Sequence, residues 1–248
     1  MQNHKELITS LQNLLDDKAT QKTKVWWENY MKGVIQFRGV GIPEIRALIA
    51  FWINKYSIDD FSMEEQLELT LALFREPVAE DKLAGILYLQ YYLYNRLDWK
   101  ILLRKYETLY LDDLIFDWNT CDWFCVRVLS PTIAMNGVDC AKSISLWRTS
   151  NNLWQARSSV VAFVKVASNQ SYYPYIQESC HALIERQERF AKTSVGWVLR
   201  DISKHDESFV KFFVEQHLKS FSVESLRNAL KYMDRAEREK YVKMLRTA

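Results

Sequence analysis

The sequence contains few of the residues that interrupt regular structure, with only Gly 6 and Pro 4 in 248 residues. Because glycine and proline supply most tight turns, this scarcity argues against a sheet with many hairpins and favours many helices joined by short loops. Cysteine is also scarce and no CxxC pair occurs, so the sequence indicates neither a disulfide framework nor a zinc knuckle. We expect reduced thiols, no metal site and a cytoplasmic protein. The four cysteines are Cys121, Cys125, Cys140 and Cys180.

Long apolar runs and a strong charge of one sign are missing as well. The most apolar run, LAGILYLQYYLY at 83–94, is too short to span a bilayer, and MQNHKELITSLQNLLDD has no apolar core of the signal-peptide type. We therefore expect no membrane partner. The net charge of +2 does not single out a nucleic-acid binder, although an acidic face elsewhere can balance a basic one.

The sequence is rich in apolar and aromatic side chains. Hydrophobic residues make up 48% of it, with Trp 9, Tyr 13 and Phe 12. A chain of this length and composition can bury a sizeable core as one domain. We expect most of the rings in that core, but so many rings leave some for a binding surface.

Apolar residues recur at steps of three and four along most of the chain, which predicts helices nearly everywhere. One such stripe is Val195, Val198, Leu199 and Ile202. Capping residues mark helix starts, as where Ser62 precedes Glu65 by three positions. The predicted helices, with bounds accurate to about two to four residues, span 3–16, 21–33, 43–56, 63–75, 80–95, 98–110, 118–129, 138–148, 152–167, 173–186, 190–204, 206–217, 222–232 and 234–246.

Helix pairs recur at intervals of about 35–45 residues, which is typical of a helical-repeat array. A single bundle explains the pattern less well, because four long helices would leave many short ones without a place. No linker rich in proline or serine divides the chain. We predict an all-α fold, a helical-repeat superhelix (α-solenoid) that forms one domain over residues 1–248. The concave face of such an array commonly binds an extended partner.

One carboxylate lies among indoles. In the segment DWNTCDWFCVR (117–127), Asp122 stands between Trp118 and Trp123. A carboxylate in such surroundings is costly unless a positive group meets it. Within a helix, Trp118 and Asp122 are four residues apart and share a face. Two interpretations stay open: Asp122 is structural, as a cap or as an ion pair with Arg127, or it binds a cationic ligand.

The helix around residue 197 places an indole on a polar face. Trp197 lies roughly opposite the apolar stripe, on a partly basic face that includes Arg200. It is either a second packing residue or part of a binding surface. Upstream, Arg157 borders an apolar stripe and Lys165 lies further onto the polar side. Such side chains either pair with nearby carboxylates or contact phosphates.

Three stretches, WNTCD (118–122), NLWQARSSVVAFVKVA (152–167) and SVGWVLRDISKHD (194–206), resemble the AlkD-type DNA alkylation repair glycosylases in order and spacing. The segments YMKGVIQFRGVGIPEIRAL (30–48), FREPVAEDKLAGILYL (74–89) and SVESLRNALKYM (222–233) extend the resemblance over nearly the whole chain. The combination of GW-x-LR with W-xxx-D and W-xx-R is its most specific part. The resemblance implies a HEAT-like superhelix whose concave groove holds duplex DNA.

The resemblance also implies an activity, namely the removal of N3- and N7-alkylated purines with no metal or organic cofactor. It implies that the lesion is contacted through its backbone while it stays stacked. Arg200, on the polar face of Trp197, is our further candidate for a DNA contact. The roles carried over are a catalytic carboxylate for Asp122, lesion-pocket walls for Trp118 and Trp197, phosphate contacts for Arg157 and Lys165, and a DNA contact for Tyr30.

These residue types suit that chemistry. An N3- or N7-alkylpurine already carries a positive charge, so the base can leave without a general acid, through an oxocarbenium-like sugar. A fixed carboxylate at Asp122 would stabilise that sugar and orient the attacking water. The indoles of Trp118 and Trp197 can pack on the deoxyribose and present π faces to positive charge. The expected partner is duplex DNA containing alkylated purines, bound by a monomer.

Two other classes of function stay open at this point. A non-catalytic scaffold for damaged or branched DNA predicts salt-sensitive binding without base release. A scaffold for protein–protein contacts predicts no DNA affinity at low salt, and the small net charge favours it.

Overall fold

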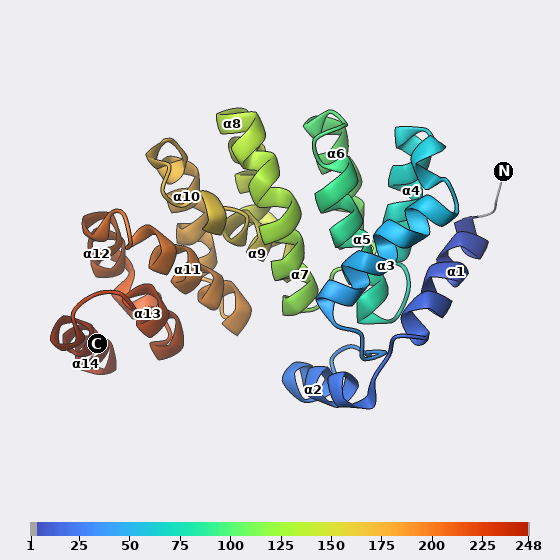
Figure 1. Cartoon of the computed structure of the whole chain (residues 1–248). Helices are drawn as coiled ribbons and strands as arrows, with labels where there is room; N and C mark the ends of the chain where they lie inside the picture. The colour runs from blue at the N-terminus through green and yellow to red at the C-terminus, as the bar shows by residue number, and fades with distance from the viewer. Residues whose placement is uncertain (1–3, 248) are drawn as a thin grey trace. The chain divides into compact units, whose positions relative to one another are not determined.

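The computed structural model describes residues 4–247, and their regular structure is helical apart from one isolated parallel bridge between Gln36 and Val78 (Figure 1). The predicted all-α helical-repeat class is confirmed. The α-helices are α1 (His4–Asp16), α2 (Gln21–Met31), α3 (Ile42–Lys55), α4 (Met63–Leu73), α5 (Ala79–Tyr88), α6 (Trp99–Leu111), α7 (Trp118–Phe124), α8 (Ser130–Ser145), α9 (Leu153–Val161), α10 (Tyr173–Ile184), α11 (Arg189–Ile202), α12 (Glu207–His217), α13 (Val223–Ala229) and α14 (Arg235–Thr247).

Most of the predicted helices occur within a few residues of their expected bounds; residue 3, the expected start of the first, lies outside the described residues. Two of the expected helices change to π-helical turns, at Leu89–Leu93 after α5 and at Cys125–Leu129 after α7. The expected helix at 152–167 ends as an α-helix at Val161 and is followed by a 3-10 turn at Val164–Val166. Propensity does not distinguish these tighter and wider turns from an α-helix.

The expected helix at 138–148 covers only the second part of α8. The helix begins at Ser130, with Pro131 in its first turn, where the fixed φ of proline suits a helix start. It is then kinked at Gly137, whose φ of 70° and ψ of −149° are not helical. Glycine adopts such a conformation without steric cost, so the sequence pattern restarts after it.

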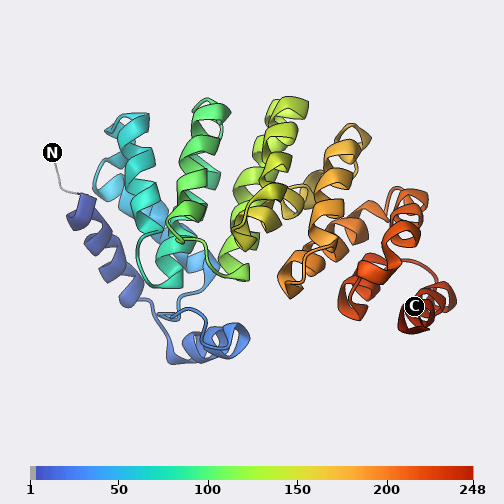
Figure 2. The same cartoon turned by 180° about the vertical axis from the view of Figure 1, so that it is seen from behind.

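The chain divides into two compact units, the first ending at Val128 and the second starting at Leu129. In the first unit, α3 and α4 pack against both α1 and α5, and α5 also contacts α7. Figures 1 and 2 both show α2 set apart from the neighbouring helices of this unit. In the second unit, α11 packs against α9, α10, α12 and α13. The single domain over residues 1–248 stays a prediction.

The loop that follows α2 is fastened by one buried carboxylate. Glu80, on α5, accepts hydrogen bonds from the backbone N–H groups of Arg38 (3.0 Å), Gly39 (2.8 Å) and Val40 (3.1 Å). Gly39 has a φ of 104°, and a Cβ there would collide with the carbonyl oxygen of Thr20, so this position requires glycine. Because Thr20 caps the start of α2 and the clamped loop follows its end, these contacts hold α2 from both sides.

Two more charged side chains of α5 are buried next to Glu80. The carboxylate of Asp81 pairs with the Arg38 guanidinium at 2.8 Å, and the ammonium of Lys82 donates to the carbonyl oxygens of Phe74 and Leu114. Burial raises the pKa of Asp81 to about 6, against the opposing effect of Arg38. Burial also lowers the pKa of Lys82. The charges of this segment are therefore structural.

We expect the free energy of unfolding to fall as the pH rises through the titration of Asp81. Its folded pKa of about 6 lies above the ordinary 3.8, so the folded protein holds the proton more tightly than the unfolded chain does. The contribution is fully present below about pH 4 and lost by about pH 7, and it amounts to roughly 3 kcal/mol. Chemical denaturation of wild type and Asp81→Asn across this range measures it. The variant should lack this pH-dependent contribution to the free energy of unfolding. An equal pH dependence in both proteins would contradict the raised pKa of Asp81.

No helix among residues 4–247 is long and apolar enough to cross a membrane.

Candidate functional site

The helix α7 carries the predicted carboxylate and one of its indoles. The buried Asp117 caps this helix, since its carboxylate accepts a hydrogen bond from the backbone N–H of Thr120 at 2.9 Å. The segment after the cap is helical, as expected, so Trp118 and Asp122 lie one turn apart on the same face. Both side chains are partly buried. The guanidinium of Arg127 lies 4.9 Å from the centre of the Trp123 ring.

The exposed rings of α2 meet this face of α7. Tyr30 and Trp118 meet in a T-shaped arrangement with ring centres 4.8 Å apart, and Tyr30 also stacks on Trp26 at 5.3 Å and an interplanar angle of 15°. Trp27 instead stacks on Phe37 at 5.1 Å and packs against the core of the unit. Since Trp26 and Tyr30 stay about half exposed, at 58% and 48%, they continue the aromatic surface of Trp118 toward solvent.

The charge of Asp122 reaches this aromatic surface. The pKa of the Tyr30 phenol is raised by partial burial and, next, by the negative charge of Asp122. The negative charge of Asp122 therefore acts on the Tyr30 side chain. Three of the predicted site residues, Tyr30, Trp118 and Asp122, are therefore brought together within the first unit.

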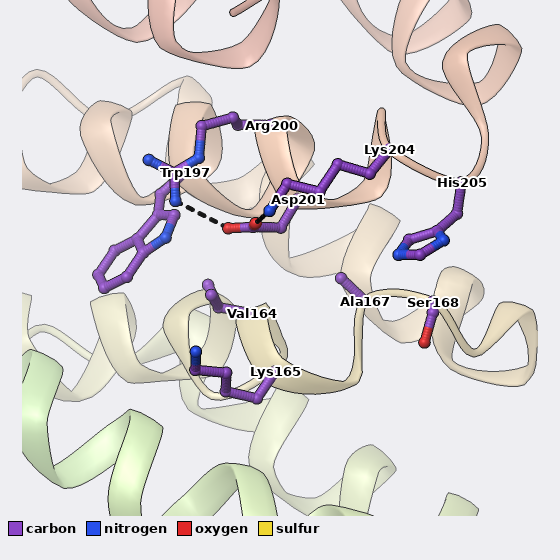
Figure 3. A pocket seen from close by; sticks show the side chains of 9 residues that line it. All are labelled: Val164, Lys165, Ala167, Ser168, Trp197, Arg200, Asp201, Lys204 and His205. Atoms are coloured by element: carbon purple, nitrogen blue, oxygen red, sulfur yellow. Dashed lines mark hydrogen bonds and ion pairs between the residues drawn. The ribbon is translucent and has the colours of Figure 1, made fainter. Parts of the chain in front are cut away.

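The second unit holds Trp197, which lies on α11. The apolar stripe predicted for this helix is fully buried, and Trp197 lies on another side, partly buried, where it lines a pocket of about 330 Å³ (Figure 3). Arg200 also lines this pocket, and its guanidinium lies 5.8 Å from the centre of the Trp197 ring. Lys165 enters from the 3-10 turn after α9 and is exposed. Three of the predicted residues, Trp197, Arg200 and Lys165, thus share one pocket.

One carboxylate organises the cations of the pocket. Asp201 accepts from Nη2 of Arg200 at 2.9 Å and also pairs with the ammonium of Lys204. The remaining lining includes Ser168 and His205. The pocket is therefore polar and predominantly cationic, which suits an anionic ligand.

Arg157 differs from the other predicted cations because it is buried, with an exposure of 4%. Its guanidinium donates to the carbonyl oxygen of Phe190 and to the hydroxyl of Thr193, and it lies 5.9 Å from the centre of the Phe190 ring. These contacts tie α9 to α11. Its contact with a DNA phosphate stays a prediction.

The glycine next to Trp197 allows α11 and α13 to approach closely. A Cβ on Gly196 would lie 2.5 Å from the carbonyl oxygen and 3.0 Å from the Cα of Ser225, both backbone atoms that cannot move independently. The GW pair of the sequence thus combines a close helix contact with a pocket residue.

We expect Gly196→Ala to destabilise the protein by about 2–3 kcal/mol, because overpacking forces two helices apart. Chemical denaturation measures this. Gly41→Ala is the matched control, since a Cβ there meets chiefly the mobile end of the Glu44 side chain. A loss below 1 kcal/mol at position 196, or equal losses at both positions, would contradict the close helix contact as its cause.

Some site residues were not singled out from the sequence. Trp26 sits in the run VWWENY, where periodicity does not tell which of two adjacent tryptophans packs inward. The fold assigns that role to Trp27 and leaves Trp26 on the surface. His205 and Ser168 carry no signal in the sequence, because each lines the pocket only through tertiary structure.

Residues 4–247 contain no cluster of three or more histidine, cysteine or acidic side chains that could hold a metal ion. All four cysteines are buried, and burial raises the pKa of the Cys140 thiol to about 12.

Comparison with known proteins gives a consistent picture. The family model described as DNA alkylation repair enzyme matches residues 11–233. Among solved structures, the chain is similar to one titled "Predicted DNA alkylation repair enzyme from Enterococcus faecalis", with 19% sequence identity and a TM-score of 0.74. The match covers 88% of this chain and 98% of that one, and at this identity it establishes the fold. No curated protein matches the sequence.

Proposed function

Because the chain belongs to the DNA alkylation repair enzyme family, we propose that it is a DNA glycosylase that excises positively charged N3- or N7-alkylated purines from duplex DNA. Family membership gives it a role in the repair of alkylated DNA. The reaction type, the class of adduct and the residues that act are the proposal.

The observation that carries this proposal is the position of Asp122. Its carboxylate belongs to the same helix face as Trp118, and its charge acts on the phenol of Tyr30. Negative charge beside a partly exposed aromatic surface is suited to a cation, because both the carboxylate and the ring faces attract positive charge. An alkylated purine nucleotide supplies that cation.

The reaction needs little proton transfer. As the bond between the purine nitrogen and C1′ breaks, its electron pair goes to the purine and neutralises the positive charge that the alkyl group created. The sugar becomes oxocarbenium-like, and water adds to C1′ and loses a proton. Asp122 stabilises the sugar cation electrostatically and orients the water, while Trp118 and Tyr30 shield the site from bulk solvent.

Base flipping is not required in this proposal. The rings of Trp26, Tyr30 and Trp118 form an aromatic surface on α2 and α7. A surface of this kind can pack against deoxyribose and backbone while the lesion stays stacked.

In the second unit, the proposed DNA contacts are Trp197, Arg200 and Lys165, together with Arg157. The protein acts as a monomer in this proposal.

A duplex with a single 7-methylguanine tests the proposal. The wild-type protein should convert that position to an abasic site, seen as strand cleavage after mild alkali, and should leave an unmodified duplex intact. Binding of the same duplex without any abasic site, after prolonged incubation and with 3-methyladenine also intact, would identify a non-catalytic DNA-binding protein and contradict the proposal.

A further inference from the structure

Two histidine side chains face each other in the second unit. His181 lies in the last turn of α10, and His217 lies in the last turn of α12. Nδ1 of His181 is 3.4 Å from Nε2 of His217, and the two ring centres are 5.0 Å apart. A direct hydrogen bond at this distance is long, because N–H donors in proteins usually lie about 2.7–3.2 Å from their acceptors. The spacing therefore suits another kind of link between the two rings.

The distance between the two nitrogens fits two ligands of one zinc ion. Zinc binds imidazole nitrogens at about 2.0–2.1 Å and prefers a tetrahedral arrangement of four ligands. Two nitrogens 3.4 Å apart, each at that distance from one ion, subtend an angle of about 110° at the ion, which is close to tetrahedral. Metal ions that prefer neighbouring ligands at right angles need the two nitrogens closer together, at about 2.9 Å. The pair is therefore better suited to zinc.

A carboxylate orients the ring of His217. Oε1 of Glu185 lies 3.7 Å from Nδ1 of His217, and it accepts a hydrogen bond from the hydroxyl of Ser220 at 2.7 Å, which fixes its position. The carboxylate favours a proton on Nδ1, so that the lone pair of His217 is on Nε2, the nitrogen next to His181. Metal-binding histidines commonly have such a carboxylate at the nitrogen that does not bind the ion.

The surroundings favour a neutral imidazole and a bound cation. Burial lowers the pKa of His217, and the charge of a protonated His181 lowers it further, against the opposing effect of Glu185. His217 is therefore neutral at neutral pH, as a metal ligand must be. Both histidines lie at the C-terminal ends of helices, where the partial negative charge of the backbone favours a cation. The exposed His181 leaves the pair accessible to an ion from solvent.

We propose that His181 and His217 bind one Zn²⁺ ion, through Nδ1 and Nε2 respectively, and that the ion joins α10 to α12. Glu185 faces the other nitrogen of His217 and is not a third ligand, so water completes the coordination. The pair is thus smaller than the clusters of three side chains that are absent from residues 4–247.

This proposal differs from the expectation of no metal site in the sequence. The two histidines are 36 residues apart, with no motif between them, and only the fold brings them together. None of the residues involved belongs to the proposed DNA site, so the inference is independent of the proposed function.

A zinc titration of the full chain, purified without a histidine tag, tests the proposal. NMR follows the ring C–H signals of the histidines, and those of His181 and His217 are identified by their loss in His181→Gln and His217→Gln. Zinc chloride at neutral pH should shift both signals together and should saturate at one ion per chain. The signal of His4 should stay in place. Magnesium chloride should shift neither signal of the pair, because Mg²⁺ prefers oxygen ligands.

Variants separate the histidine pair from general binding of zinc to the surface, with affinity measured by calorimetry. His181→Gln changes an exposed side chain, so the fold should be kept, and it should abolish saturable binding because one imidazole remains. Glu185→Gln should weaken zinc binding by about tenfold, the lower range for a group behind a metal-bound histidine. His4→Gln is the control, since it removes an imidazole from the first unit and should leave the affinity unchanged.

The outcomes distinguish this inference from the proposed function. If zinc shifted neither signal, or shifted them without saturation, the two histidines would be linked by a hydrogen bond alone and the zinc site would be wrong. Equal zinc affinity of the wild type and His181→Gln would also overturn it. Base release is not measured in this test, so a protein that binds zinc at this pair but leaves alkylated DNA intact would contradict only the proposed function.

Discussion

Asp122→Asn is expected to reduce the rate of base release by about a thousandfold, the upper range for removing one preorganised electrostatic group from an active site. The amide keeps the size and most of the hydrogen-bonding capacity of the carboxylate but removes its charge. Since the charge is needed mainly when the sugar becomes cationic, affinity for duplex DNA should be equal or higher. Single-turnover excision from a duplex with one 7-methylguanine measures the rate, and fluorescence anisotropy measures the affinity.

Asp60→Asn is the matched control for this variant, because it makes the same change on an exposed residue of the same unit. Its excision rate should equal that of the wild type. If Asp122→Asn excised the base at the wild-type rate with unchanged affinity, Asp122 would be structural and the catalytic role would be wrong.

Glu80→Ala is expected to have the largest effect on stability, a loss of roughly 4 kcal/mol in the free energy of unfolding. The carboxylate receives hydrogen bonds from three backbone N–H groups of the loop that follows α2, and the variant leaves these buried donors without it. Each hydrogen bond to a charged group contributes about 1.5–3 kcal/mol, and such contributions are not additive. Chemical denaturation at neutral pH measures the loss.

This variant should also affect the site, since the clamped loop holds α2 and α2 carries Tyr30. Quenching of the fluorescence of the α2 tryptophans, or hydrogen exchange of their indole N–H groups, should increase relative to the wild type. Glu64→Ala, an exposed glutamate in the first turn of α4, is the control and should change stability by about 0.5 kcal/mol or less. If Glu80→Ala lowered the free energy of unfolding by no more than this control, water would replace the carboxylate and the loop would not depend on it.

The spacing of apolar residues along the sequence was sufficient to predict the helices and to tell which residues lie on the same side of one helix. The stripe on α11 fixed which side is buried, and hence that Trp197 and Arg200 lie together elsewhere. The step of four between Trp118 and Asp122 likewise placed them on one face. These inferences succeed because the period of the helix alone decides them.

Contacts between segments far apart in the sequence could not be predicted from helix periodicity. The contact of Tyr30 with Trp118 depends on how α2 is held, and that depends on the burial of Glu80 and Asp81. Consecutive charged residues normally indicate a solvated surface, so the sequence pattern EDK gives the opposite expectation. Their burial is explained by specific partners, namely backbone N–H groups and the Arg38 guanidinium, that the fold brings from elsewhere in the chain.

The most direct test of the catalytic role of Asp122 is the mass-spectrometric identification of bases released from methylated duplex DNA by the wild type, beside Asp122→Asn. Free 7-methylguanine or 3-methyladenine is expected with the wild type and almost none with the variant. Release of neither base by the wild type, or equal release by both proteins, would contradict it.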